Sequence, residues 1–184
     1  MISKLISCLR YFFIFNQCTG NLSRIKDFGL AYDWSLIRGD VNKIRFGKGA
    51  RILGRVVFVL DGDGIINIGD NVTIEDGAYI NSHGGEITIG NNVFIGRGAI
   101  IQGMGGVIIG ANSMMGPNSQ IYSSNHIFKG EDVVRKSLQE KCSPVLIGEN
   151  CWLCANSIIT AGVTINQDEV VLPSIVRRPS HLEV

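Results

Sequence analysis

The side chains most able to transfer protons in this chain are its histidines. The 184-residue sequence contains three of them, His83, His126 and His181. An imidazole with an ordinary pKa of about 6.5 can remove a proton from a hydroxyl near neutral pH. His181 lies in the last residues of the chain and is a poor candidate for catalysis, whereas His83 and His126 lie in segments rich in Ser, Asn and Gly. We therefore treat His126 as the candidate general base and His83 as a loop residue that could line an acceptor site.

The cysteines offer a second kind of chemistry. Cys151 and Cys154 form a Cys-X-X-Cys pair, which can support redox or zinc chemistry. No second pair is present to complete a zinc site, and the five cysteines of the chain follow no regular framework. We expect no metal site. We see no secretory cleavage site, so we expect reduced thiols and a cytoplasmic protein.

Composition excludes some partners. The formal net charge is +1 and charged residues make up 18% of the chain, which gives no electrostatic case for nucleic-acid binding. The apolar run at residues 5–15 is interrupted by Arg10 and falls short of the roughly 20 residues that a membrane span needs. We expect this run to form a short helix that packs on the rest of the fold, with contact to a membrane surface as the alternative.

The elements that must position these residues follow from a repeat of six residues. Large aliphatic residues recur at this spacing, with weaker copies at Phe46, Ile52 and Phe58. The main series is Ile68, Ile74, Ile80, Ile89, Ile95, Ile101, Ile109, Met115, Ile121, Ile147, Leu153, Ile159, Ile165 and Val171. A repeat this short is a strand plus a turn, and it can bury its apolar side only by stacking on its neighbours.

Two other positions of the hexad are also restricted. The third residue after each aliphatic is Asn, Gly or Asp in ten hexads, and these types tolerate a left-handed backbone. The fourth residue is small, as at Ala78, Ala99 and Ser119, and we expect it to point inward beside the aliphatic. Three hexads then close a triangular coil, and coils stack into a prism. In this register Cys151 takes the small inward position and Cys154 a position usually held by Gly. Their side chains should diverge, which argues against redox or metal chemistry and a cysteine nucleophile.

Insertions interrupt the repeat at one place in each coil. Short insertions at residues 61–64, 83–85 and 103–106 each follow the third hexad, so we expect them to share one corner of the prism. The largest insertion, residues 123–144, begins with Ser123-Ser124-Asn125-His126 and continues through a charged stretch. A long loop that projects from a rigid scaffold is a common place for functional residues.

This pattern resembles the hexapeptide-repeat acyltransferases over residues 46–178. The more specific matches are Ser123–His126 and the segment Ile147–Asn156, which are similar to sugar and capsular polysaccharide O-acetyltransferases. The resemblance implies an all-β fold, a left-handed parallel β-helix of stacked triangular coils with one long projecting loop. We expect residues 1–45 to form an N-terminal helical or irregular cap and residues 179–184 to form a tail.

The resemblance also implies roles for individual residues. His126 matches the general base of the family, and the family works as homotrimers with active sites between subunits. Binding of acetyl-CoA is implied for Trp152, Ala155, Ala161, Arg177 and Arg178. The last coil is one residue shorter and bulkier than in the family, which puts its contacts with CoA in doubt. The acceptor-binding Asn of the galactoside-type enzymes has no clear match. We assign substrate binding to Arg97, His83 and Asn125.

The expected function is acetyl-CoA-dependent O-acetylation of a sugar hydroxyl. We compare it with four alternatives. Two of them are N-acetylation of an amino sugar and acetylation of a xenobiotic. A carbonic anhydrase of related fold would need three metal-binding histidines, and the positions of the histidines here do not support one. A non-catalytic β-helix scaffold is the remaining alternative, but it would have no need for the His126 loop together with Trp152. We expect the acceptor to be a cell-surface polysaccharide or its precursor.

Overall fold

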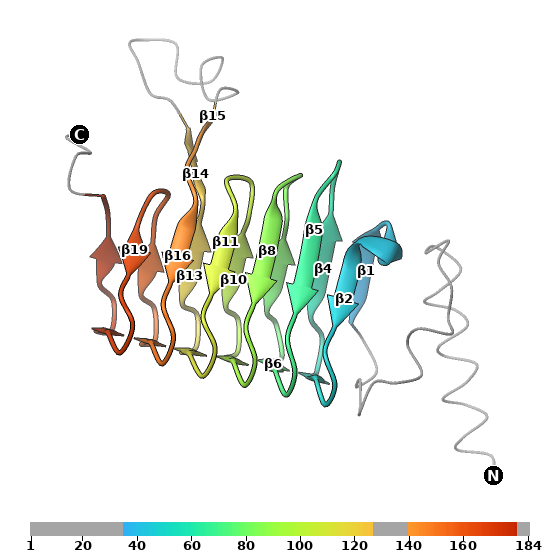
Figure 1. Cartoon of the computed structure of the whole chain (residues 1–184), viewed down its shortest axis with the longest axis horizontal. Helices are drawn as coiled ribbons and strands as arrows, with labels where there is room; N and C mark the ends of the chain where they lie inside the picture. The colour runs from blue at the N-terminus through green and yellow to red at the C-terminus, as the bar shows by residue number, and fades with distance from the viewer. Residues whose placement is uncertain (1–34, 127–139, 180–184) are drawn as a thin grey trace.

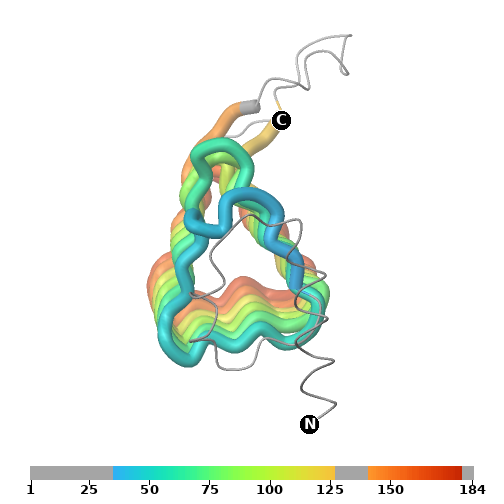
Figure 2. Tube along the Cα trace, turned by 90° about the vertical axis from the view of Figure 1, so that its right-hand side faces the viewer, coloured from blue at the N-terminus to red at the C-terminus, as the bar shows by residue number. Residues whose placement is uncertain are grey.

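The computed structural model describes residues 35–126 and 140–179, and these residues form a left-handed parallel β-helix. The predicted N-terminal helix and C-terminal tail lie outside the described residues. The chain winds around three flat sheets, so the molecule is a triangular prism when viewed along its axis (Figure 2). The predicted fold class is confirmed for this part of the chain.

Each sheet forms one face of the prism, which we call faces A, B and C. Face A contains β3 (Arg51–Leu53), β6 (Thr73–Glu75), β9 (Phe94–Ile95), β12 (Met114–Met115), β17 (Trp152–Leu153) and β20 (Val170–Val171). Face B contains β1 (Leu36–Gly39), β4 (Val57–Leu60), β7 (Tyr79–Asn81), β10 (Ile100–Gln102), β13 (Gln120–Tyr122), β18 (Ile158–Ile159) and β21 (Val176–Arg177). Face C contains β2 (Ile44–Phe46), β5 (Ile65–Ile68), β8 (Glu86–Ile89), β11 (Val107–Ile109), β16 (Val145–Ile147) and β19 (Thr164–Ile165). The chain passes from C to A to B in every coil.

The hexad register predicted from the sequence is the register of the structure. All fourteen aliphatic positions of the main series are buried, and so are the small positions that follow them. The Asn, Gly and Asp positions all have positive φ, for example 58° at Asn92 and 60° at Asn112. At the corner between faces C and A these side chains also bond to one another, with Asn92 Nδ2 donating to Asn112 Oδ1 at 3.0 Å.

The coils differ in length at one corner only. Ile44 pairs with Ile66, Ile66 with Ile87 and Leu146 with Thr164, so these repeats are 22, 21 and 18 residues long. The coil with the largest insertion is the longest, because Val107 pairs with Val145. The extra residues always lie between face B and face C, at the top of the prism in Figure 1. We call this edge the loop corner. The prediction that the insertions share a corner is confirmed.

The β-helix begins earlier than the hexads indicate. β1 pairs with β4 on face B, so the first coil starts at Leu36 rather than at residue 46. A 3-10 turn, η2 (Val41–Lys43), replaces the corner here, and its cap Asp40 accepts a hydrogen bond from Asn42 N at 2.9 Å. Because this turn breaks the spacing of six, the first coil could not be recognised by periodicity.

Candidate functional site

The loop corner is built from tight turns that stack on one another. Gly64 N donates to Asp61 O at 3.1 Å, Gly85 N to Ser82 O at 2.8 Å, and Gly106 N to Gly103 O at 2.8 Å. In the next coil the turn is replaced by an antiparallel hairpin, β14 (Ser124–His126) with β15 (Glu140–Cys142). The hairpin projects away from the prism (Figure 1), so the base of the predicted loop 123–144 is an ordered support.

Ser123 fixes this hairpin to the prism. Its side chain is fully buried, and its Oγ donates to Gln102 O at 2.9 Å and accepts from Gly105 N at 2.9 Å. Its carbonyl accepts from Ser143 N at 3.0 Å on the returning strand. Both ends of the hairpin are therefore tied to the turn of the preceding coil. A hydroxyl at this register was visible in the sequence, but the role of Ser123 as an anchor was not.

The hairpin presents His126 and Asn125 on different sides. Both lie on β14, where His126 is exposed and Asn125 is half-buried. Successive side chains of a strand leave opposite faces, so these two do not converge on one substrate atom within this hairpin. His126 is paired in register with Glu140, and Asn125 with Lys141. The exposed imidazole is placed to meet a ligand outside the prism.

A second feature lies on face A. The outward side chains of four neighbouring strands, Phe94, Met114, Trp152 and Val170, form one apolar column in register. The indole of Trp152 is 46% exposed. A groove of about 440 Å³ runs along this column and continues onto the corner between faces A and B. It is lined by Phe94, Met114, Gly116, Pro117, Trp152, Cys154, Ala155, Val170, Leu172 and Pro173. We call it the Trp152 groove.

The two features lie on opposite sides of one chain. The hairpin leaves the corner between faces B and C, and face A is the side of the triangle opposite that corner (Figure 2). His126 and Trp152 therefore do not form one site within a single prism. Ala155 lies in the Trp152 groove, whereas Ala161 is buried at the loop corner, where Gly162 N donates to Pro144 O at 3.2 Å.

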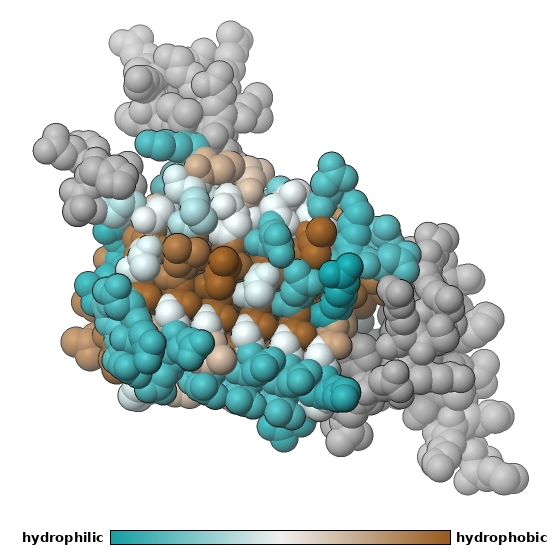
Figure 3. Space-filling view, in the orientation of Figure 1, coloured by the Kyte–Doolittle hydropathy of each residue, from teal (hydrophilic) through white to brown (hydrophobic). Residues whose placement is uncertain are grey.

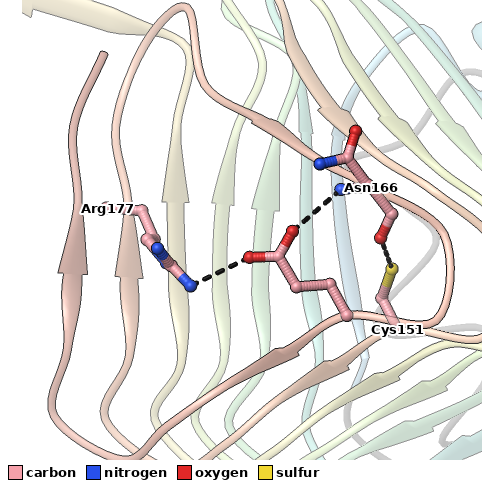
Figure 4. A network of polar contacts seen from close by, with 4 residues as sticks. Cys151, Asn166 and Arg177 are labelled. Carbon is pink, nitrogen blue, oxygen red and sulfur yellow. Dashed lines mark hydrogen bonds and ion pairs between the residues drawn. The ribbon is translucent and has the colours of Figure 1, made fainter. Parts of the chain in front are cut away.

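Arg177 forms an ion pair at the end of the prism. It pairs in register with the inward-pointing Ile159, so it takes an inward position of the last coil. Its guanidinium donates to Glu169 Oε1 at 2.9 Å, and Glu169 Oε2 accepts from Asn166 N at 3.2 Å (Figure 4). This network joins residues of the last two coils.

The remaining predicted residues are at corners. Arg178 is exposed just after β21. Arg97 is exposed at the corner between faces A and B, where its backbone N donates to Glu75 Oε2 at 3.1 Å. His83 is half-buried in the turn after β7, and its Nε2 lies 2.9 Å from Asn81 Nδ2.

Cys151 and Cys154 lie in different surroundings. The Cys151 thiol is buried and donates to Asn166 O at 3.0 Å, and burial raises the pKa of this thiol. A neutral, hydrogen-bonded thiol is a poor nucleophile. Cys154 lines the Trp152 groove, and both thiols are free. Within residues 35–126 and 140–179 no group of three or more metal-binding side chains is arranged to hold an ion.

A further apolar area lies on face C. Ile108 and Leu146 are neighbours in register on face C, and both are exposed. Figure 3 shows apolar side chains in the middle of the face that Figure 1 presents. The described part of the chain contains no helix whose length and apolarity would let it cross a bilayer.

Comparison with known proteins agrees with this architecture. A family model described as the hexapeptide repeat of succinyl-transferase matches residues 86–122 and 144–172. A Dictyostelium discoideum protein named as a candidate acetyltransferase is 40% identical over 55 residues, which are 30% of this chain and 28% of that protein. The chain thus matches little more than a quarter of the length of this relative.

Two solved structures share the fold. One is a hexapeptide transferase family protein from Anaplasma phagocytophilum, with a TM-score of 0.54 and 23% identity over 74% of this chain and 68% of that chain. The other is a variant of AntD, an N-acyltransferase from Bacillus cereus, in complex with dTDP-4-amino-4,6-dideoxyglucose and coenzyme A. It has a TM-score of 0.52 and 21% identity over 71% of this chain and 74% of that chain. At these identities the likeness establishes the fold.

Proposed function

We propose that this chain is a member of the hexapeptide-repeat family and an acyltransferase that moves an acetyl group from acetyl-CoA to a sugar hydroxyl. The observation that carries the proposal is the hairpin β14–β15, which holds an exposed His126 beside a repeat that matches the family model. Ser123 supports the hairpin with three hydrogen bonds. A scaffold protein has no need for a histidine on such a support.

The proposed reaction is a direct transfer with His126 as general base. The imidazole takes the proton of the sugar hydroxyl as its oxygen attacks the thioester carbon. The carbon–sulfur bond of the tetrahedral intermediate then breaks, and the proton passes from the imidazolium to the departing CoA thiolate. No metal or acetyl-cysteine intermediate takes part. Cys151 stays protonated because burial raises its pKa.

The Trp152 groove is the proposed place for the pantetheine arm. Its lining is apolar and includes Trp152 and Ala155, and a narrow apolar groove suits an extended chain with a terminal thioester. Arg178 is exposed and available for the CoA phosphates, because guanidinium matches phosphate geometry. Arg177 already binds Glu169, so its contribution requires that ion pair to open. Ala161 belongs to the loop corner, so it would lie near the thioester end of a ligand held in the groove of a neighbouring chain.

The site is proposed to be complete only between two chains. The groove and the hairpin lie on opposite sides of one prism, so His126 of one copy must approach the groove of another. A closed ring of three copies satisfies this head-to-tail relation for every chain. We therefore propose a homotrimer with one site at each interface, working in the cytoplasm on a cell-surface polysaccharide or its precursor.

N-acetylation of an amino sugar is the second candidate. It is favoured by the fold similarity to AntD, which is an N-acyltransferase solved with an amino-sugar nucleotide and coenzyme A. The two reactions use the same base and the same donor. They differ in the acceptor, which a panel of neutral, acidic and amino sugars separates.

Release of free thiol from acetyl-CoA in the presence of this panel tests the proposal. His126→Ala should reduce turnover by about a thousandfold, the scale of general base catalysis, without changing the oligomer. Asp63→Asn, a change in an exposed turn of the same corner, is the matched control. Full activity of the His126 variant would remove the mechanism, and no binding of acetyl-CoA by calorimetry would favour a scaffold.

Mixing two inactive variants tests the shared site. His126→Ala and Trp152→Ala should each be inactive alone. When they are unfolded and refolded together, random assembly should restore about a quarter of the sites, because each site needs one intact contribution from each of two chains. If both residues served the same chain's site, the mixture would stay inactive.

A further inference from the structure

The turn that follows β7 contains a polar cluster outside the catalytic assignment above. Tyr79 and Asn81 point outward from face B, on either side of the inward-pointing Ile80, and His83 follows in the turn. Asn81 is only 2% exposed although it points outward, because the turn covers it. Tyr79 and His83 are half-buried and keep part of their surface open to solvent.

The backbone at His83 lies in the left-handed region, which is uncommon for residues other than glycine. Its φ is 46°, and the next residue, Gly84, has φ of 83°, the pattern of a type I′ turn. Such a turn most often has Asn, Asp or Gly at its first central position, and His is also found in this backbone region more often than most residues.

The hydrogen bonds of Asn81 determine where the protons of the cluster lie. Asn81 Oδ1 accepts from the backbone N–H of His83 at 2.8 Å, and a backbone N–H can only donate. The other end of the amide is therefore the NH₂ group. It donates to Tyr79 Oη at 3.1 Å and faces His83 Nε2 at 2.9 Å. Since the NH₂ group has no lone pair to offer, His83 Nε2 must be the acceptor.

The two outer residues are left as donors. With Nε2 unprotonated, the neutral imidazole carries its proton on Nδ1, which is therefore a donor. Tyr79 Oη uses a lone pair for Asn81, so its hydroxyl hydrogen also remains for another partner. One buried amide thus orients an N–H and an O–H at the loop corner, two coils away from the base of the His126 hairpin.

We propose that His83 and Tyr79 bind a carboxylate of an acidic sugar, with Asn81 as the positioning residue. A carboxylate only accepts hydrogen bonds, so it fits a pair of donors. The ammonium group of an amino sugar only donates hydrogen bonds, so it does not fit a site made of two donors. This inference rests on the proposed function and specifies its acceptor. It also gives a physical reason to favour an acidic sugar over an amino sugar.

Nitrogen NMR of the imidazole tests the proton assignment without any reaction. In the wild-type chain the Nε2 of His83 should show the chemical shift of an unprotonated ring nitrogen, and Nδ1 that of a protonated one. In Asn81→Asp a carboxylate oxygen replaces the NH₂ group, so the proton should move to Nε2. A protonated Nε2 in the wild-type chain would overturn the inference.

Binding of glucuronate, glucose and glucosamine to the full chain tests the ligand class without acetyl-CoA. Glucuronate should bind best, and His83→Asn should weaken it about tenfold, the value of one hydrogen bond to a charged group. Asn suits positive φ, so this variant should keep its melting temperature. Asp63→Asn in the neighbouring turn should change neither quantity. Equal binding of the three sugars, absence of glucuronate binding, or unchanged binding by His83→Asn would overturn the inference.

Kinetics separate this inference from the proposed function. In the variants His83→Asn and Asn81→Asp the KM for an acidic acceptor should rise, while the KM for acetyl-CoA stays as in the wild type. If glucuronate binds as described but no sugar is acetylated, the proposed function fails and the binding site stands. If acetylation occurs with no preference for acidic sugars, the proposed function stands and the carboxylate-binding site fails.

Discussion

Two serines occupy the same register in neighbouring coils, and replacing each by alanine should change the free energy of unfolding in opposite directions. Ser119 and Ser157 both occupy the small inward position behind face B and are fully buried. Ser119 Oγ donates to Gly116 O at 2.8 Å. Ser157 Oγ is buried and finds no hydrogen-bond partner among the described residues. Ala99 and Ala78 hold this register two and three coils before Ser157, so alanine fits it.

The magnitude follows from these contacts. Ser157→Ala removes a buried hydroxyl without a partner, and its desolvation cost indicates a gain of about 1 kcal/mol in the free energy of unfolding. Ser119→Ala loses one hydrogen bond, but the Gly116 carbonyl keeps its bond from Ser119 N at 3.2 Å. The loss should therefore be at the low end, about 0.5 kcal/mol. For a chain of this size the two variants should differ in melting temperature by about 3–6 °C.

Urea unfolding followed by circular dichroism measures the effect. All samples need the same protein concentration, because an oligomer gains apparent stability with concentration. Equal slopes of the unfolding curves would show that only stability has changed. A Ser157→Ala variant that is as unstable as Ser119→Ala would refute the assignment of these two inward positions.

Three further predictions concern the end of the prism, the buried thiol and the corners. Glu169→Gln breaks a partly exposed ion pair with Arg177, so the free energy of unfolding should fall by no more than about 0.5 kcal/mol, and high salt should abolish the difference in thermal melts. Because burial raises the pKa of Cys151 above the ordinary 9.0, the unfolded chain loses its thiol proton first. Stability should therefore be complete below pH 9.0 and fall as pH rises beyond it, and Cys151→Ala should remove this slope in urea midpoints measured against pH. Asn112 has φ of 60°, so Asn112→Ala should lower stability by about 1–2 kcal/mol in the same assay, and Asn112→Gly by less; equal losses would contradict a role for the left-handed conformation.

The register of the prism could be predicted from the sequence because it depends on local rules. An inward aliphatic, a small neighbour and a residue that tolerates positive φ recur in every hexad, and each choice is made within six residues. Ile101 and Asn112 show the result, one fully buried and one at φ of 60°. The first coil escaped this reading because η2, capped by Asp40, breaks the spacing.

The contacts at the ends and corners depend on residues far apart in the chain. Glu169 and Arg177 both fall at inward positions of the register. Charged residues at two inward positions were a signal in the sequence that this is the last coil. Their ion pair could be seen only in the structure. Asn81 looked like an ordinary turn residue in the sequence. Only the structure shows that it is buried beside His83, with its NH₂ group 2.9 Å from Nε2, and this contact is the basis for the proposed tautomer of the imidazole.

The sequence by itself determined the coil, its inward residues and the two candidates that the repeat does not explain, His126 and Trp152. It could do so because strand, corner and stacking are consequences of side-chain size and backbone preference repeated at a fixed spacing. The tertiary structure decided that the hairpin and the groove lie on opposite sides of one prism. Three hexads close each coil into a triangle, so the corner that carries the hairpin lies opposite the face that carries the groove. Because of this closure, the proposed site must be shared between two chains.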